Sequence, residues 1–141
     1  MTTLRGCATP EATAAYAARF AGDTVPGHFR PTTDGLTIAS IGVGTYLGDA
    51  DEETDDSYQA AIERALALGC NHLDTAVNYR LQHSERVLGR ALRAAIKRGD
   101  VRREEVIVAT KGGFVPFDGA LPPDPRKWVY DHYIEPGLAH A

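Results

Sequence analysis

Three titratable side chains fall where two neighbouring strands are expected to end. Residues 71–76 are expected to form a short buried strand with Asp74 near its carboxyl end, because they lie between a helix stop at Gly69 and a polar loop, and the β-branched apolar run at residues 106–111 is expected to form a second strand that ends at Lys111. Tyr79 follows Asp74 by five positions, in a polar loop. Because parallel strands lie roughly 5 Å apart, side chains at matching strand ends can meet. We expect the three to converge at the carboxyl edge of a parallel sheet, where α/β enzymes place their chemistry.

A helix between the two strands makes them parallel. Ser84 is expected to cap this helix and Gly99 to end it. A strand, a crossover helix and a second strand form a βαβ unit, whose strands run in the same direction. One face of the helix is an apolar stripe of Leu88, Ala91, Leu92, Ala95 and Ile96, and the other carries cations that we expect to be solvated, Arg86, Arg90, Arg93, Lys97 and Arg98.

An acidic segment opens the helix that precedes the first of these strands. Thr54 is expected to cap that helix, with Asp55 and Asp56 in its first turn, where carboxylates are favourable against the helix dipole. We interpret the acidic residues of the segment 49–56 as a solvated cap rather than a metal site. The apolar stripe of this helix consists of Tyr58, Ala61, Ile62, Ala65 and Leu66.

The strand expected at residues 38–45 has a bare end. Gly42 and Gly44 alternate there with larger residues, and a strand end without side chains either admits a flat ligand or eases packing. Before this strand, the turn residues Asp34 and Gly35 lie between two extended segments and predict a β-hairpin.

Two further helices have roles that the sequence leaves open. A helix from Thr9 to Phe20 is interpreted as a frayed extension or as a partner-binding element. Residues 114–141 are rich in proline and aromatic residues, and Asp124 with Pro125 can open a helix there. The aromatic side chains of this segment either form a substrate wall or pack the loop onto the scaffold.

The charged residues also fit simpler roles. Asp74 and Lys111 fit a structural ion pair, and Tyr79 fits a ring that packs a loop. His72 and Asp74 stand on one face of a strand, a pattern that a metal-dependent barrel hydrolase needs. No further pair of such ligands follows the other two strands, which weakens the metal hypothesis.

Three strings of residues, in order, resemble the first half of an aldo-keto reductase. They are Asp74-Thr75-Ala76-x-x-Tyr79, Ser84-Glu85-x-x-Leu88-Gly89-Arg90-Ala91-Leu92 and Ala109-Thr110-Lys111. The resemblance implies an α/β fold that is the N-terminal part of a (β/α)8 TIM barrel, with about three parallel strands and their helices. A β-hairpin and an extra N-terminal helix precede it. Residues 1–28 are then a helical extension and residues 29–141 a partial barrel.

The resemblance also implies an activity, NADP-dependent hydride transfer to an aldehyde or ketone, or the reverse reaction. The substrate is then a small carbonyl compound or alcohol. Tyr79 is the implied proton donor, and the Lys111 ammonium favours loss of its proton. Asp74 keeps Lys111 charged and in place. The implied contacts with NADPH are made by Gly44, Thr45, Tyr46 and Asp74.

Length limits what 141 residues can do alone. A full (β/α)8 barrel takes about 250 residues, so the sequence predicts part of a barrel. The resemblance implies a catalytic histidine after the next strand, and neither His132 nor His140 follows an apolar strand. We therefore expect the 141-residue chain to be inactive by itself. An exposed third strand favours the alternative of a non-catalytic half-barrel that self-associates or binds a partner.

Composition excludes several other classes of function. The net charge of −4 provides no basic surface for nucleic acid, and no apolar run is long enough to cross a membrane. Cys7 and Cys70 lack the spacing of metal ligands, and Cys70 is expected to be a small buried side chain. We expect a cytoplasmic protein with no membrane or nucleic-acid partner.

Overall fold

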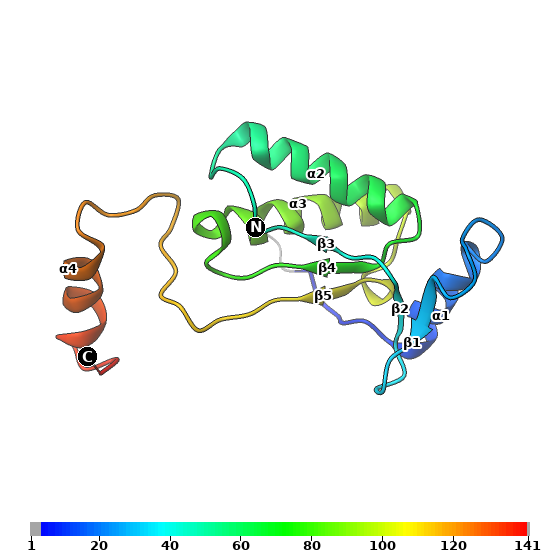
Figure 1. The fold of residues 1–141 in the computed structure, drawn as a ribbon, viewed down its shortest axis with the longest axis horizontal. Helices are drawn as coiled ribbons and strands as arrows, with labels where there is room; N and C mark the ends of the chain where they lie inside the picture. Colours follow the sequence, from blue (N-terminus) through cyan, green and yellow to red (C-terminus); the bar gives the residue numbers. More distant parts are fainter. Residues whose placement is uncertain (1–3, 141) are drawn as a thin grey trace.

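A computed structural model describes residues 4–140, and its centre is a parallel sheet (Figure 1). The strands, in the order β3-β4-β5, are Val43–Gly44, His72–Asp74 and Ile107–Ala109. Asp74 pairs in register with Gly44 on one side and with Ala109 on the other. The predicted βαβ unit is therefore confirmed, and the strand ends that carry Asp74 and Lys111 lie at the same edge.

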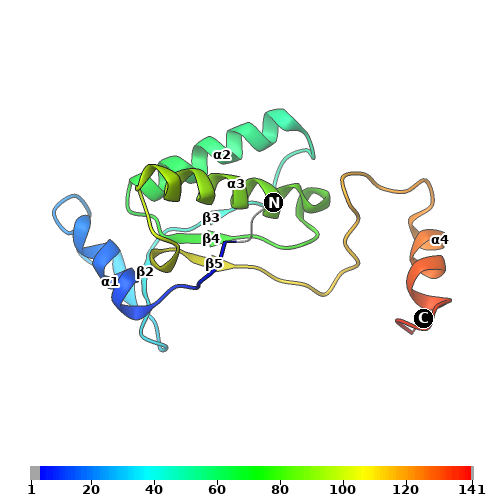
Figure 2. The same cartoon turned by 180° about the vertical axis from the view of Figure 1, so that it is seen from behind.

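Two helices cover one face of the sheet, as both views show (Figures 1 and 2). Helix α2 spans Glu52–Ala67 and helix α3 spans His83–Arg98, and the two pack against each other. Gly99 ends α3 in the left-handed conformation, with φ of 82°, as predicted. The apolar core between the helices and the sheet is made by Ile62, Leu66, Leu73, Leu88, Ala91, Leu92, Ala95, Val101 and Val106, together with Tyr16.

The starts of both helices differ from the prediction. The cap of α2 is Asp51, whose carboxylate accepts a hydrogen bond from the Thr54 N–H, so Thr54 lies inside the first turn. Ser84 also lies inside its helix, where it is buried and donates to the carbonyl of Thr45 over 2.5 Å. A left-handed turn at residues 80–82 leads into α3 in place of a side-chain cap.

Helix α1 (Pro10–Arg19) is docked on the core, so its interpretation as a frayed extension is wrong. Its cap is Thr9, as predicted, and the ring of Tyr16 has no exposed surface. The Tyr16 hydroxyl donates to the carbonyl of Leu66 over 2.6 Å. One buried ring with one long-range hydrogen bond therefore fixes α1 to the end of α2.

The hairpin beside α1 is formed by β1 (Phe29–Pro31) and β2 (Thr37–Ala39), which pair antiparallel as predicted. The strand expected over residues 38–45 is broken in two, because β2 belongs to the hairpin and only β3 joins the parallel sheet. Asn71, directly before β4, ties β2 to the parallel sheet: its side chain accepts from the Ala39 N–H and donates to the Thr37 carbonyl, each over 2.9 Å.

After β5 the chain runs away from the sheet to α4 (Pro125–Val129), which Asp124 caps as predicted (Figure 1). A π-helical turn, Tyr130–Ile134, continues this helix. The aromatic residues here pack mainly on one another, with Trp128 stacked on His132 at 4.3 Å and 5.3 Å from the Phe117 ring. Within residues 4–140, no helix has the length and apolar character needed to span a bilayer.

Candidate active site

The predicted ion pair forms at the carboxyl edge of the sheet. The Lys111 ammonium donates to Asp74 Oδ1 and to the Thr75 carbonyl, each over 2.8 Å. Both charged side chains are about half exposed, so the pair faces solvent. The hydrogen bond that Lys111 donates to Asp74 is the main cause that raises the pKa of Lys111, and Tyr79 adds to the effect. This ammonium therefore stays charged through neutral pH.

Tyr79 lies against this ion pair. The Lys111 Nζ is 4.9 Å from the centre of the Tyr79 ring, at cation–π distance. The Tyr79 ring also meets the exposed Tyr46 ring edge-on, with 5.0 Å between the ring centres. The structure thus brings together the three residues expected at the carboxyl edge, and it adds Tyr46 as a neighbour.

The two glycines near β3 have different surroundings. A Cβ built on Gly42 would lie 2.7 Å from Nδ1 of His72, so Gly42 serves packing. A Cβ on Gly44 would meet no atom of the described residues within 4 Å, so the strand end beside Asp74 is open on their side. The packing role therefore belongs to Gly42, and the role of Gly44 stays a prediction.

Thr45 is buried beneath this open strand end. Its N–H and its hydroxyl both donate to the carbonyl of Asp74, over 3.1 Å in each case, and its side chain has no exposed surface. Ser84 donates to the Thr45 carbonyl from below, at the start of α3. Of the residues expected to contact NADPH, Thr45 orients the Asp74 backbone, while Gly44 and Tyr46 face solvent.

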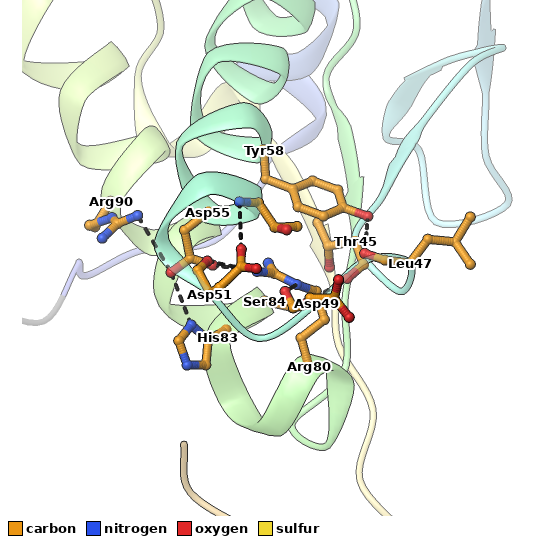
Figure 3. Close-up of polar contacts among 11 residues, drawn as sticks. Thr45, Leu47, Asp49, Asp51, Asp55, Tyr58, Arg80, His83, Ser84 and Arg90 are labelled. Carbon is orange, nitrogen blue, oxygen red and sulfur yellow. Dashed lines mark hydrogen bonds and ion pairs between the residues drawn. The ribbon is translucent and has the colours of Figure 1, made fainter. Parts of the chain in front are cut away.

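A buried charge cluster under the Tyr79 loop was missed at the level of sequence (Figure 3). Asp55, expected to be solvated, is only 6% exposed, because its Oδ1 accepts a hydrogen bond from the Arg80 guanidinium over 2.7 Å. His83 and Arg90 approach its other oxygen, Oδ2, at 3.1 and 3.7 Å. Arg90, expected on a solvated face, therefore points partly into this cluster.

The segment after β5 is tied to the same loop. Gln82 donates to the Phe117 carbonyl over 3.2 Å, the Gly119 N–H donates to the Leu81 carbonyl over 3.0 Å, and Arg86 pairs with Asp118 at 2.7 Å. The base of this segment therefore rests on the turn that follows Tyr79.

Within the part of the chain that the structure describes, no three His, Cys, Asp or Glu side chains are grouped so that they could hold a metal ion. The imidazole of His72 packs against Gly42, and Asp74 is engaged by Lys111. Cys70 is buried as expected, with its thiol 3.1 Å from the Ile41 carbonyl. Burial raises the pKa of this thiol.

Comparison with known proteins agrees with this arrangement. The profile of the aldo/keto reductase family matches residues 40–135. Aldose reductase C of Dictyostelium discoideum is 37% identical over 78 residues, which are 55% of this chain and 22% of that protein. Glycerol 2-dehydrogenase (NADP(+)) of Hypocrea jecorina is 37% identical over 78 residues, 55% of this chain and 23% of that protein.

The match covers most of this chain but a smaller part of its relatives. An aldo-keto reductase of Bombyx mori is 38% identical over 79 residues, which are 55% of this chain and 25% of that protein. The chain thus spans about a quarter of the length of the curated relatives it matches. The family profile covers well over half of the chain, including Asp74, Tyr79 and Lys111. The chain belongs to the aldo/keto reductase family.

Proposed function

We propose that the protein is an NADPH-dependent carbonyl reductase, and that these residues supply the proton-donating part of its site. The reaction is hydride transfer to an aldehyde or a ketone, or its reverse. The observation that carries this proposal is the position of the Lys111 ammonium, bonded to Asp74 at 2.8 Å and lying 4.9 Å from the Tyr79 ring centre. Membership of an oxidoreductase family supports it.

Each residue of this group has a distinct role. A carbonyl that accepts hydride develops negative charge on its oxygen, and a proton donor within about 3 Å stabilises that charge. Tyr79 is the proton donor. Lys111 places a positive charge against the Tyr79 ring, and Asp74 fixes the position of Lys111.

The open strand end beside this group fits the flat nicotinamide ring. NADPH supplies the hydride when it is bound. Gly44 leaves space next to Asp74, and the exposed Tyr46 ring borders the same space beside Tyr79. Thr45 supports this surface from below through its two bonds to the Asp74 carbonyl. The Hypocrea jecorina relative, a glycerol 2-dehydrogenase (NADP(+)), supports NADP as the cofactor.

Deuterium transfer tests this function. The whole protein is incubated with NADPH deuterated at C4 of the nicotinamide and with a panel of aldehydes and ketones. The expected product is an alcohol that carries the deuterium on the former carbonyl carbon. Turnover without deuterium in the product would contradict hydride transfer. We expect the 141-residue polypeptide, assayed alone, to give no turnover.

The edge of β5 supports a second, non-catalytic proposal. Among the described strands, β5 pairs only with β4, so its other edge offers unpaired backbone groups to another chain. We infer that this edge supports self-association or binding of a partner. Sedimentation of the 141-residue chain over a range of concentrations tests self-association, and a monomer that is independent of concentration and melts cooperatively would contradict it.

A further inference from the structure

The backbone directly after Tyr79 adopts an unusual conformation. Arg80, Leu81 and Gln82 have φ angles of 48°, 54° and 72°, so three consecutive residues other than glycine are left-handed. This conformation is costly for residues with a Cβ and persists only where the surroundings impose it. Something must hold the turn in place.

The Arg80 side chain is what ties the turn to the rest of the protein (Figure 3). Only 1% of this side chain is exposed. Its Nε donates to the Asp49 carbonyl over 2.7 Å, and its Nη2 donates to Asp55 Oδ1 over 2.7 Å and to the Asp51 carbonyl over 3.4 Å. Its guanidinium carbon also lies 5.1 Å from the centre of the Tyr58 ring. Arg80 therefore joins the turn to the loop before α2 and to the first turns of that helix.

The same contacts reach the loop that carries Tyr46. The Tyr58 hydroxyl donates to the Leu47 carbonyl over 2.8 Å, one residue after Tyr46. The opposite oxygen of Asp55 lies 3.1 Å from Nδ1 of His83, the first residue of α3. The cluster thus holds the chain on both sides of the ring contact between Tyr46 and Tyr79.

The energetics favour a conformational role for this cluster over a purely stabilising one. A buried ion pair is weak evidence for stability, because the cost of removing both charges from water offsets their attraction. In addition, Nη1 of Arg80 is buried and has no hydrogen-bond partner among residues 4–140. The turn at residues 80–82 contains no glycine or proline that would favour its left-handed conformation. The contact between Arg80 and Asp55 fixes that conformation instead.

We propose that Arg80, held by Asp55, is a positioning residue that sets the Tyr79 ring against Lys111. This inference rests on the proposed function, because it matters for catalysis only if Tyr79 donates the proton. It adds to that function a structural determinant outside the reacting group. Arg80 touches neither the Asp74 carboxylate nor the Lys111 ammonium, and it acts through the backbone of the turn.

Proton NMR of the 141-residue chain tests the positioning directly. Lys111 lies over the Tyr79 ring, so the ring current shifts the methylene protons next to its Nζ. Arg80→Ala is expected to move these protons to the values of exposed lysines, whereas Lys97→Ala on the exposed side of α3 leaves them unchanged. An unchanged Lys111 signal in folded Arg80→Ala would overturn the proposal.

A conservative variant covers the case in which Arg80→Ala does not fold. Arg80→Lys keeps the charge near Asp55 but lacks the planar fork that contacts Asp49, Asp51 and Asp55 at once. The Lys111 shift is expected to be reduced in this variant. If the shift keeps its full size, the fork does not position Tyr79, and the proposal is wrong.

Turnover of the whole protein separates this proposal from the function on which it rests. Arg80→Lys is expected to lower kcat about 100-fold, the effect of a displacement of about 1 Å in a catalytic group, with the KM of the carbonyl substrate little changed. A residue that served only stability would lower the melting temperature and leave kcat unchanged. If Tyr79→Phe retains activity, the proposed function fails while the NMR result still stands. If Tyr79→Phe abolishes turnover and Arg80→Lys changes neither kcat nor the Lys111 signal, only the positioning role fails.

Discussion

Lys111 and Asp74 join two neighbouring parallel strands at their carboxyl ends, with Nζ and Oδ1 2.8 Å apart. The register that pairs Asp74 with Ala109 places Lys111 just beyond the end of β5, within reach of the carboxylate. The same ammonium faces the Tyr79 ring. The contact between Asp74 and Lys111 therefore holds the Lys111 ammonium beside Tyr79, where the proposed chemistry needs a positive charge.

Asp74→Asn is expected to lower the pKa of Lys111 towards its ordinary value, because Asp74 is the main cause of the raised pKa. A lysine whose pKa is raised on folding stabilises the fold below the unfolded pKa of about 10.4, and this contribution is lost as pH rises through the folded pKa. An NMR titration of the Lys111 side chain measures the change, with the exposed Lys97 as an internal reference. Equal Lys111 pKa values in both proteins would show that the contact does not hold the charge.

Asp55→Ala is expected to destabilise the chain by about 3–5 kcal/mol, because it leaves the buried charge of Arg80 without its partner. Asp56→Ala is the matched control, since Asp56 is exposed in the same turn of α2, and it should change stability by less than about 0.5 kcal/mol. Urea denaturation of both variants gives the two values. Equal, small effects would mean that Asp55 is solvated in solution.

Tyr16→Phe is expected to lower the free energy of unfolding by about 1–3 kcal/mol, because it leaves the Leu66 carbonyl without its buried hydrogen-bond donor. Tyr130→Phe removes a hydroxyl from a ring that is 54% exposed and is the control. Burial raises the pKa of Tyr16. The folded chain therefore keeps a proton that the unfolded chain loses above pH of about 10, so stability should fall in that range, and less steeply in Tyr16→Phe. Identical urea midpoints for Tyr16→Phe and Tyr130→Phe would mean that α1 is not docked.

The two glycines near β3 should respond differently to alanine. Gly42→Ala places a methyl group 2.7 Å from the His72 ring and is expected to cost about 1–3 kcal/mol of stability. Gly44→Ala meets nothing within 4 Å, so it should leave stability nearly unchanged but weaken NADPH binding by the whole protein. Fluorescence titration with NADPH and a urea melt measure the two effects. Full NADPH affinity in Gly44→Ala would place the nicotinamide elsewhere.

The sequence predicted those features of the fold and the site that depend on residues close together along the chain. A β-branched run, a helix stop and a crossover helix determine strand direction, and strand direction alone places Asp74 and Lys111 at one edge. The hairpin at Asp34-Gly35 and the cap at Thr9 are local in the same way. Each is decided by residues that are close together along the chain.

The parts that were missed depend on distant partners. Asp55 has the sequence context of a solvated first-turn carboxylate, and its burial depends on Arg80, twenty-five positions later, together with His83 and Arg90. The left-handed turn at residues 80–82 contains neither glycine nor asparagine, the residues that usually signal such a turn. The sequence therefore contains no sign of the turn, and Ser84 was predicted to cap α3. The docking of Tyr16 likewise depends on the Leu66 carbonyl, fifty positions away. No local pattern reports such contacts.

Turnover of the Tyr79→Phe variant of the whole protein tests the role of Tyr79 as proton donor. Carbonyl reduction by NADPH is measured beside NADPH binding. We expect a loss of about 10²–10⁴-fold in kcat, the usual contribution of a general acid, with NADPH affinity unchanged. Turnover of Tyr79→Phe equal to that of the unmodified protein would show that Tyr79 is not the proton donor.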